Sequence, residues 1–191
     1  DAHNFFSGYA EMLKHGLISN VEHWAELLSF DTINIDYAAL KRLVGKSVQV
    51  KEDIVEQDPF EHGIRKALNL GHTVGHAFES MALAENRPIL HGYAVAWGIV
   101  CELYLSHLKV GFPKEKMRQT IQFIKDNYGV FTFDCKKYEQ LYAFMTHDKK
   151  NTSGTINFTL LKDIGDIRIN QIADKDTIFE MLDFYRECMG I

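Results

Sequence analysis

The sequence predicts a mainly α-helical, multi-helix domain with one small β-hairpin. Apolar residues recur at helical spacing through most of the chain, whereas near its end Ile156, Phe158 and Leu160 alternate with a period of two. The 191 residues, 46% hydrophobic and 25% charged, are enough for one sizeable domain with its own core. No repeat, low-complexity stretch or linker divides them, so we expect a single domain over residues 1–191.

Two helices are expected in the first third of the chain. One begins almost at the first residue, because helical spacing relates Phe6, Tyr9, Ala10, Leu13 and Leu17. A second, long helix is capped by Asp36 and carries an apolar stripe at Leu40, Val44, Val48 and Val55. Lys51 interrupts this stripe. It is either a lysine at the edge of the core or a cation that faces an anionic ligand.

The remaining elements follow from turn residues and periodicity. Pro59 and Gly63 break the long helix, and a helix rich in small residues follows at about 71–81. After a loop at 86–90, further helices are expected from His91 to near Gly111, then at 114–127 and 136–146, and from Asp174 to Gly190. The hairpin is expected from a strand at 155–161, a turn at Gly165 and a second strand at about 167–172.

Composition narrows the functional class. The formal net charge of −5 argues against a nucleic-acid surface, and no apolar run approaches membrane-spanning length. The first residues are polar and carry no basic segment typical of a signal peptide. Cys101, Cys135 and Cys188 are few and far apart, as expected for reduced thiols. We therefore expect a cytoplasmic protein.

The densest polar chemistry lies between Arg65 and His76. Arg65, Asn69, His72 and His76 would share one stripe if the whole stretch were helical, and Gly71 predicts a break beside the stripe. Two histidines four residues apart can hold a divalent metal ion, although such a pair is more often a solvated helix face. The zinc-protease pattern needs glutamate directly after the first histidine; here the residue is Thr73.

Two further residues complete a candidate metal site. His91 lies at a loop-to-helix junction, where its imidazole can point into a cleft or simply substitute for a helix cap. Glu11 is either a ligand or half of a weak ion pair with Lys14. One glutamate and two histidines would leave a coordination position open, as a catalytic zinc site requires.

Five segments in this order resemble the 3-dehydroquinate synthase family. They are GYAEMLKHG at 8–16, KEDIV at 51–55, EHGIRKALNLGHTVGHA at 61–77, LHG at 90–92 and DKKN at 148–151. The resemblance covers nearly the whole chain and is most specific in the glycine-histidine segment. It implies a C-terminal domain that supplies metal and substrate contacts, while an N-terminal NAD-binding domain is absent from this chain, which has no glycine-rich nucleotide motif.

The resemblance also implies roles for individual residues. Zinc, or cobalt in its place, would be held by Glu11, His72 and His91. Catalytic residues would be His76, Lys14 and Lys51. The substrate, an acidic sugar phosphate, would be bound by Lys51, Arg65, Asn69, His76 and either Lys149 or Lys150. The complete enzyme would be a homodimer, and this chain alone would be inactive.

The reaction implied is conversion of 3-deoxy-D-arabino-heptulosonate 7-phosphate to 3-dehydroquinate and phosphate in the shikimate pathway of aromatic amino acid biosynthesis. NAD transiently oxidises a ring hydroxyl, phosphate leaves, the ketone is reduced again, and the opened ring closes by an aldol step. One residue departs from the family pattern: Tyr93 stands where glutamate is usual. The alternatives are a related cyclase such as 2-deoxy-scyllo-inosose synthase, whose substrate lacks the carboxylate, and a non-catalytic zinc-binding helical module.

Overall fold

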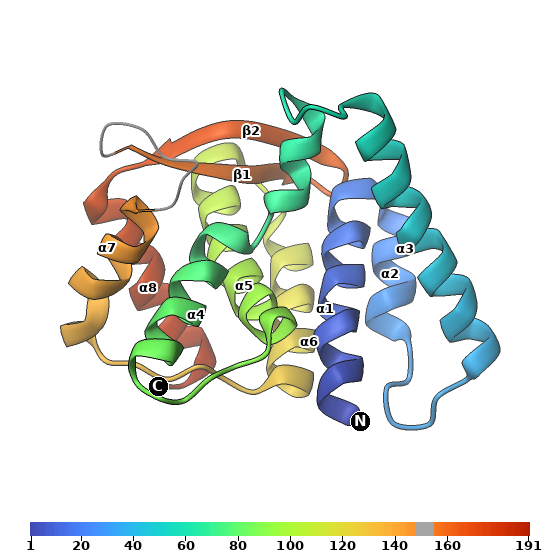
Figure 1. Cartoon of the computed structure of the whole chain (residues 1–191), viewed down its shortest axis with the longest axis horizontal. Coiled ribbons are helices and arrows are strands. Elements are labelled where there is room, and N and C mark those ends of the chain that lie inside the picture. The colour runs from blue at the N-terminus through green and yellow to red at the C-terminus, as the bar shows by residue number, and fades with distance from the viewer. Residues whose placement is uncertain (148–154) are drawn as a thin grey trace.

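The computed structural model describes residues 1–147 and 155–191. In these ranges the chain forms eight α-helices, two short 3-10 helices and one two-stranded antiparallel sheet (Figure 1), which confirms the predicted fold class. The α-helices are α1 (Ala2–Ser19), α2 (Val21–Ser29), α3 (Tyr37–Gln57), α4 (His72–Ala84), α5 (His91–Val110), α6 (Lys114–Tyr128), α7 (Tyr138–Thr146) and α8 (Lys175–Met189). The other elements are η1 (Ile64–Asn69), η2 (Cys135–Lys137), β1 (Ile156–Asp163) and β2 (Asp166–Ala173).

Helix α5 lies in the middle of the bundle and contacts α1, α4, α6, α8 and β1 (Figure 1). Thirteen of its 20 residues are buried, as expected for a helix that is apolar on every side. Even so, among the described residues no helix combines the length and the apolar character that crossing a bilayer would require.

Two glycines of α5 let its neighbours approach unusually closely. A Cβ atom on Gly98 would lie 2.0 Å from the carbonyl oxygen of Gly71, at the start of α4. A Cβ atom on Gly92 would lie 2.0 Å from the carbonyl oxygen of Ser7, in α1. Since any side chain here would force the helices apart, these glycines fix the spacing between α1, α4 and α5.

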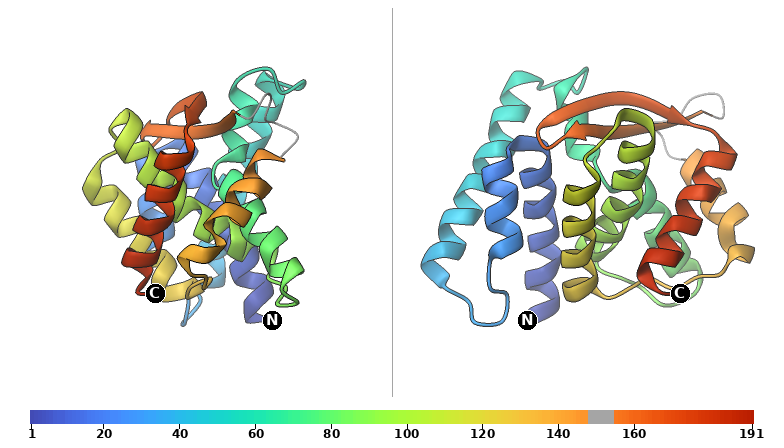
Figure 2. Two further views of the ribbon diagram at one scale, coloured as in Figure 1. Left: turned by 90° about the vertical axis from the view of Figure 1, so that its left-hand side faces the viewer. Right: turned by 180° about the vertical axis from the view of Figure 1, so that it is seen from behind.

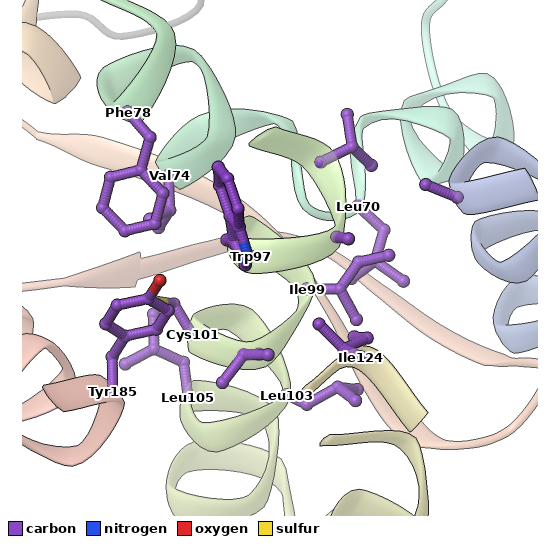
Figure 3. Packing of buried hydrophobic residues seen from close by; sticks show 14 of the residues in the cluster. Leu70, Val74, Phe78, Trp97, Ile99, Cys101, Leu103, Leu105, Ile124 and Tyr185 are labelled. Atoms are coloured by element: carbon purple, nitrogen blue, oxygen red, sulfur yellow. The ribbon is translucent and has the colours of Figure 1, made fainter. Parts of the chain in front are cut away.

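The core between α4, α5 and α8 is tightly packed around large side chains (Figure 3). Phe78 of α4 lies against Tyr185 of α8, with ring centroids 5.4 Å apart, and both side chains are fully buried. Leu103 of α5 is also fully buried. Burial of each such side chain contributes roughly 1.5–3 kcal/mol, so this core holds the first turns of α4 and α5 in place.

The hairpin crosses one end of the helix bundle, and both chain termini lie at the other end (Figure 2). Strands β1 and β2 pair antiparallel, with Ile156 opposite Ala173 and Asp163 opposite Asp166. The predicted turn residue Gly165 has a φ of 77°, and its N–H donates to the carbonyl oxygen of Leu17 at 2.9 Å. The predicted hairpin is confirmed, and its turn is tied to the end of α1.

Predicted helix boundaries are confirmed where local chemistry sets them. The carboxylate of Asp36 accepts the backbone N–H groups of Ala38 and Ala39, and that of Asp174 accepts the N–H of Thr177. Helix α5 ends at Gly111, in the left-handed conformation. The sequence pattern did not predict α2 as a separate helix. It begins at Val21, after the cap residue Asn20, whose side chain accepts the N–H of His23.

The expected core stripe of α3 is wrong. The buried residues of this helix are Leu43, Ser47 and Ile54, whereas Val44 and Val48 are 42% and 49% exposed. Helix α3 carries two apolar stripes at helical spacing and lies at the edge of the bundle, so only one stripe can face α1 (Figure 1). The exposed Lys51 therefore does not interrupt a core stripe.

Candidate metal centre and cation-lined cavity

Three side chains from three helices converge beside the core. Glu11 lies in the middle of α1, His72 is the first residue of α4 and His91 is the first residue of α5. Oε1 of Glu11 lies 3.2 Å from Nε2 of His91 and 3.6 Å from Nε2 of His72. The ligand atoms of the three residues all lie within 4.8 Å of one another, which is close enough for one metal ion.

Hydrogen bonds behind the two imidazoles aim them at Glu11. Nδ1 of His72 lies 3.1 Å from the carbonyl oxygen of Leu70, and Nδ1 of His91 lies 3.1 Å from Oε1 of Glu79. Both partners are acceptors, so each Nδ1 carries a proton, and in a neutral ring the lone pair is left on Nε2. Carboxylate or carbonyl partners of this kind are usual behind metal-bound histidines. The residues present therefore fit a divalent metal ion.

Helix α4 begins at His72 because of a glycine and a buried carboxylate. Gly71 has a φ of 81° and lies between η1 and α4, so the predicted break is where the sequence indicated. The completely buried Glu102 of α5 accepts the N–H of Gly71 at 2.9 Å and that of Val74 at 3.1 Å. A carboxylate is favourable at a helix N-terminus, so Glu102 holds the first turn that presents His72.

The metal-free cluster is strongly polarised. Burial opposes ionisation of Glu11, but hydrogen bonds from His72, His91 and Lys14 hold the pKa of its carboxyl well below the ordinary range. The hydrogen bonds of His91 to Glu11 and Glu79 raise the pKa of its imidazole to about 10. Without an ion, His91 is therefore a cation between two carboxylates, and a bound divalent ion would displace the proton on Nε2.

A cavity of about 410 Å³ opens beside Glu11 and His72. Its lining brings together three of the predicted cations, Lys14, Lys51 and Arg65. Lys14 is only 5% exposed, and its ammonium group lies 2.6 Å from Oε2 of Glu11. The lining also holds the carboxylates of Glu11 and Glu61, and since two carboxylates do not balance three cations, this wall of the cavity suits an anionic ligand.

The other predicted residues lie around this cavity or beyond it. Asn69 lines a neighbouring cavity of about 290 Å³, and its amide lies 3.4 Å from the carboxylate of Glu61, which lines both cavities. His76 lies on the far side of the cluster, with ring centroids 5.4 Å from His72 and 6.0 Å from His91. Lys149 and Lys150 fall outside the described residues.

Tyr93, the departure from the family pattern, packs into an aromatic group. Its ring contacts Tyr128 and Trp97, at centroid distances of 5.0 and 5.9 Å. Its hydroxyl lies 3.4 Å from Nδ1 of His3, and burial raises the pKa of the phenol. The side chain therefore helps to pack α5 against α6 and the start of α1.

Sequence reasoning missed three residues that shape the site: Glu61, Glu79 and Glu102. Glu79 had a weak signal, because it follows His76 by one helical turn. Glu102 also had a weak signal, because it is a single acidic residue within a mainly apolar helix. Glu61 had none, since its position depends on the turn before η1.

Two solved structures share this fold. One is 2-deoxy-scyllo-inosose synthase complexed with carbaglucose-6-phosphate, NAD⁺ and Co²⁺, at a TM-score of 0.75 and 20% identity over 97% of this chain and 51% of that one. Another is 2-epi-5-epi-valiolone synthase from Streptomyces hygroscopicus subsp. jinggangensis 5008 with NAD⁺ and Zn²⁺ bound. Its TM-score is 0.77 and its identity 20%, over 98% of this chain and 52% of that one. At this identity the likeness shows the fold alone.

Residues 8–151 match the family model of the 3-dehydroquinate synthase C-terminal domain, and the chain belongs to that family. It is 60% identical to the 3-dehydroquinate synthase of Parabacteroides distasonis over 191 residues, which are 100% of this chain and 54% of the relative. It is 42% identical to that of Leptospira interrogans over 170 residues, 85% of this chain and 46% of the relative. The chain thus spans about half the length of these relatives.

Proposed function

We propose that residues 1–191 form the metal- and substrate-binding domain of a 3-dehydroquinate synthase. In that enzyme a further domain would bind NAD, and the substrate would be 3-deoxy-D-arabino-heptulosonate 7-phosphate. Family membership supports this proposal, as does the 60% identity to a named synthase. The observation that carries it is a metal-ligand cluster beside a cavity lined by three cations.

Glu11, His72 and His91 would hold the ion through one carboxylate oxygen and two Nε2 atoms. A bound zinc or cobalt ion would supply Lewis-acid polarisation of a substrate hydroxyl and of the ketone made from it. Leu70 and Glu79 would keep the two imidazoles in place through their Nδ1 atoms. The protein's part is thus to keep both Nε2 atoms aimed at one point before the ion arrives.

Lys14, Lys51 and Arg65 would bind the anionic substrate. The guanidinium of Arg65 offers a planar fork that can grip a carboxylate, and one of its nitrogens is already held by the carbonyl oxygen of Pro59 at 2.8 Å. Lys51 lines the same cavity from α3. One of Lys149 and Lys150 would add a further contact, as the family resemblance implies.

His76 would move protons near the metal. Its imidazole is 46% exposed and lies beside both ligand histidines, so it can exchange protons between solvent and groups bound at the metal. Asn69 would donate or accept a hydrogen bond at the edge of the substrate. We place the reaction in the cytoplasm, where the three free cysteines would stay reduced.

The test is a chimera in which this chain replaces the matching half of the Parabacteroides distasonis synthase. We expect phosphate release from the heptulosonate phosphate, with little or none from a carboxylate-free sugar phosphate. Preference for the neutral sugar would favour the inosose synthase type of cyclase. A folded, zinc-loaded chimera without turnover on either substrate would favour the non-catalytic module.

A further inference from the structure

The turn between α3 and η1 is wrapped around a single carboxylate. Asp58 directly follows α3, and its own N–H donates to the carbonyl oxygen of Ile54 at 3.1 Å. Its Oδ1 accepts the N–H of His62 at 2.9 Å, and its Oδ2 accepts those of Gly63 and Arg65 at 2.7 and 3.0 Å. The bonds from Gly63 and His62 lower the pKa of this carboxyl, so Asp58 stays an ionised acceptor at neutral pH.

Arg65 is tied to this turn through both its backbone and its side chain. Asp58 accepts its N–H, and Nη1 of its guanidinium donates to the carbonyl oxygen of Pro59 at 2.8 Å. Within residues 1–147 and 155–191, Arg65 forms no ion pair, and its Nε and Nη2 form no hydrogen bond. Since Arg65 lines the cation-lined cavity, this edge of the guanidinium is available to a carboxylate there, from a side chain that is already ordered.

The same turn holds Glu61 in an unfavourable backbone conformation. Glu61 has a φ of 59°, in the left-handed region that residues other than glycine rarely adopt. Its N–H donates to the backbone carbonyl oxygen of Asp58 at 3.3 Å, and the next two N–H groups along the chain donate to the Asp58 carboxylate. Strain of this kind persists where surrounding bonds over-determine the backbone, and here Asp58 accepts those bonds.

The hairpin holds η1 from its other side. The hydroxyl of Thr159 donates to the carbonyl oxygen of Lys66 at 2.8 Å, and Nζ of Lys66 donates to Oδ1 of Asn170 at 3.1 Å. Loss of the Asp58 carboxylate should therefore loosen the turn and Arg65 and leave η1 attached to the hairpin. Local hydrogen bonds, and not core packing, thus fix Arg65 within its turn.

We propose that Asp58 is a positioning residue that holds the guanidinium of Arg65 toward the cation-lined cavity, ready to bind a carboxylate of the ligand. Asp58 lines neither this cavity nor the neighbouring one, so it acts through Arg65. The inference deepens the function proposed above and rests on the role given there to Arg65. Without Asp58 the ligand has to order a free side chain, which weakens binding by roughly threefold to tenfold.

The test is a titration of the metal-free chain with malonate, a small dicarboxylate, followed by amide NMR chemical shifts. Asp58→Ala should bind malonate roughly threefold to tenfold more weakly than the wild type. Asp58→Asn keeps one accepting oxygen and should recover part of this loss. On an Arg65→Ala background, Asp58→Ala should weaken binding further by less than about twofold. Such coupling is expected of a residue that acts through Arg65 and not of one that only stabilises the fold.

Asp31 offers a matched control. Its carboxylate accepts the N–H groups of Ile33 and Asn34, both at 2.9 Å, in the turn between α2 and α3. This turn lies at the opposite end of α3 from Asp58 (Figure 1). Asp31→Ala should lower the urea midpoint of unfolding about as Asp58→Ala does, and it should leave malonate affinity within about twofold of the wild type.

Several results would overturn the inference. One is unchanged malonate affinity in Asp58→Ala, and another is an equal loss with and without Arg65, since Asp58 would then act on a different group. Equal losses in Asp31→Ala and Asp58→Ala, or a wild type that binds malonate no better than Arg65→Ala, would overturn it as well. Turnover by the chimera tests the proposed function separately: a chimera without turnover, in a protein whose malonate binding depends on Asp58 through Arg65, would contradict that function alone.

Discussion

The metal cluster and the cations beside it are held in different ways. His72 and His91 begin two helices that are packed into the core, and glycines set the distance between those helices. Lys51 stands on an exposed face of α3, and Arg65 lies in a short 3-10 helix at the rim. Core packing therefore fixes the geometry of the candidate metal cluster in advance, whereas Lys51 and Arg65 belong to peripheral elements that can adjust. The third cation, Lys14, is buried in α1 and shares the fixed part.

The largest expected effect is on metal affinity. His72→Ala removes one of the three proposed ligands, so zinc affinity should fall by more than the roughly 10–100-fold that loss of a hydrogen-bond partner behind a metal ligand costs. Competition with a coloured chelator measures this. His107→Ala is not a suitable control, since that ring bonds the carbonyl oxygen of Phe112. His62→Ala is suitable, because its exposed imidazole lies outside the cluster. Equal zinc affinity in wild type and His72→Ala would refute the assignment.

The next effect tests whether core spacing sets the metal site. Gly98→Ala places a methyl group against the Gly71 carbonyl and should destabilise the fold by about 3 kcal/mol. Urea unfolding measures this, and zinc affinity should fall with it. Gly45→Ala, on the exposed side of α3, meets no atom within 4 Å and should stabilise by about 0.5–1 kcal/mol. Similar stability changes in Gly98→Ala and Gly45→Ala would contradict the claim that close helix spacing in the core sets the geometry of the cluster.

His15 lies at the border between the two regions and should give a pH signature. Burial, with the nearby Lys14, lowers the pKa of its imidazole to about 4, and its Nδ1 lies 2.5 Å from the hydroxyl of Ser47. Above the unfolded-state pKa of about 6.5, both states are neutral and this contribution to stability is complete. Between pH 6.5 and 4 the unfolded chain alone takes a proton, so about 3 kcal/mol should be lost.

Urea unfolding of the metal-free protein at several pH values checks this. His15→Asn can still bond Ser47 but cannot titrate, so its stability should fall less steeply between pH 6.5 and 4. Parallel pH curves for the two proteins would mean that the fold does not lower the pKa of His15, so that the folded and unfolded states take up its proton over the same pH range.

The smallest expected effect is on turnover, from a change at Arg65 on the rim of the cation-lined cavity. In the chimera, Arg65→Ala should remove a charge-assisted hydrogen bond of about 1.5–3 kcal/mol, a roughly tenfold to hundredfold loss in kcat/KM. The loss should be larger for the carboxylated substrate than for a neutral analogue, and Arg65→Lys should rescue only part of it. An equal loss for both substrates would mean that Arg65 binds the phosphate group or stabilises the fold, and does not bind the carboxylate.

Local sequence signals predicted much of this molecule. Asp36 and Asp174 could be assigned as caps because their partners lie within three residues, and Gly71 could be assigned as a break from its lack of a side chain. Contacts between distant segments left no such signal. Glu102 meets the start of α4 from 28 residues away, and the buried face of α3 is chosen by α1. Periodicity alone could not have chosen between its two stripes.

The most direct measurement is a crystal structure of the zinc-soaked protein with anomalous data at the zinc edge. The strongest peak should lie between Oε1 of Glu11 and the Nε2 atoms of His72 and His91, with ligand distances of about 2.0–2.2 Å. A strongest peak on His76 and Glu79, or no peak at all, would contradict the assignment of Glu11, His72 and His91 as the metal centre.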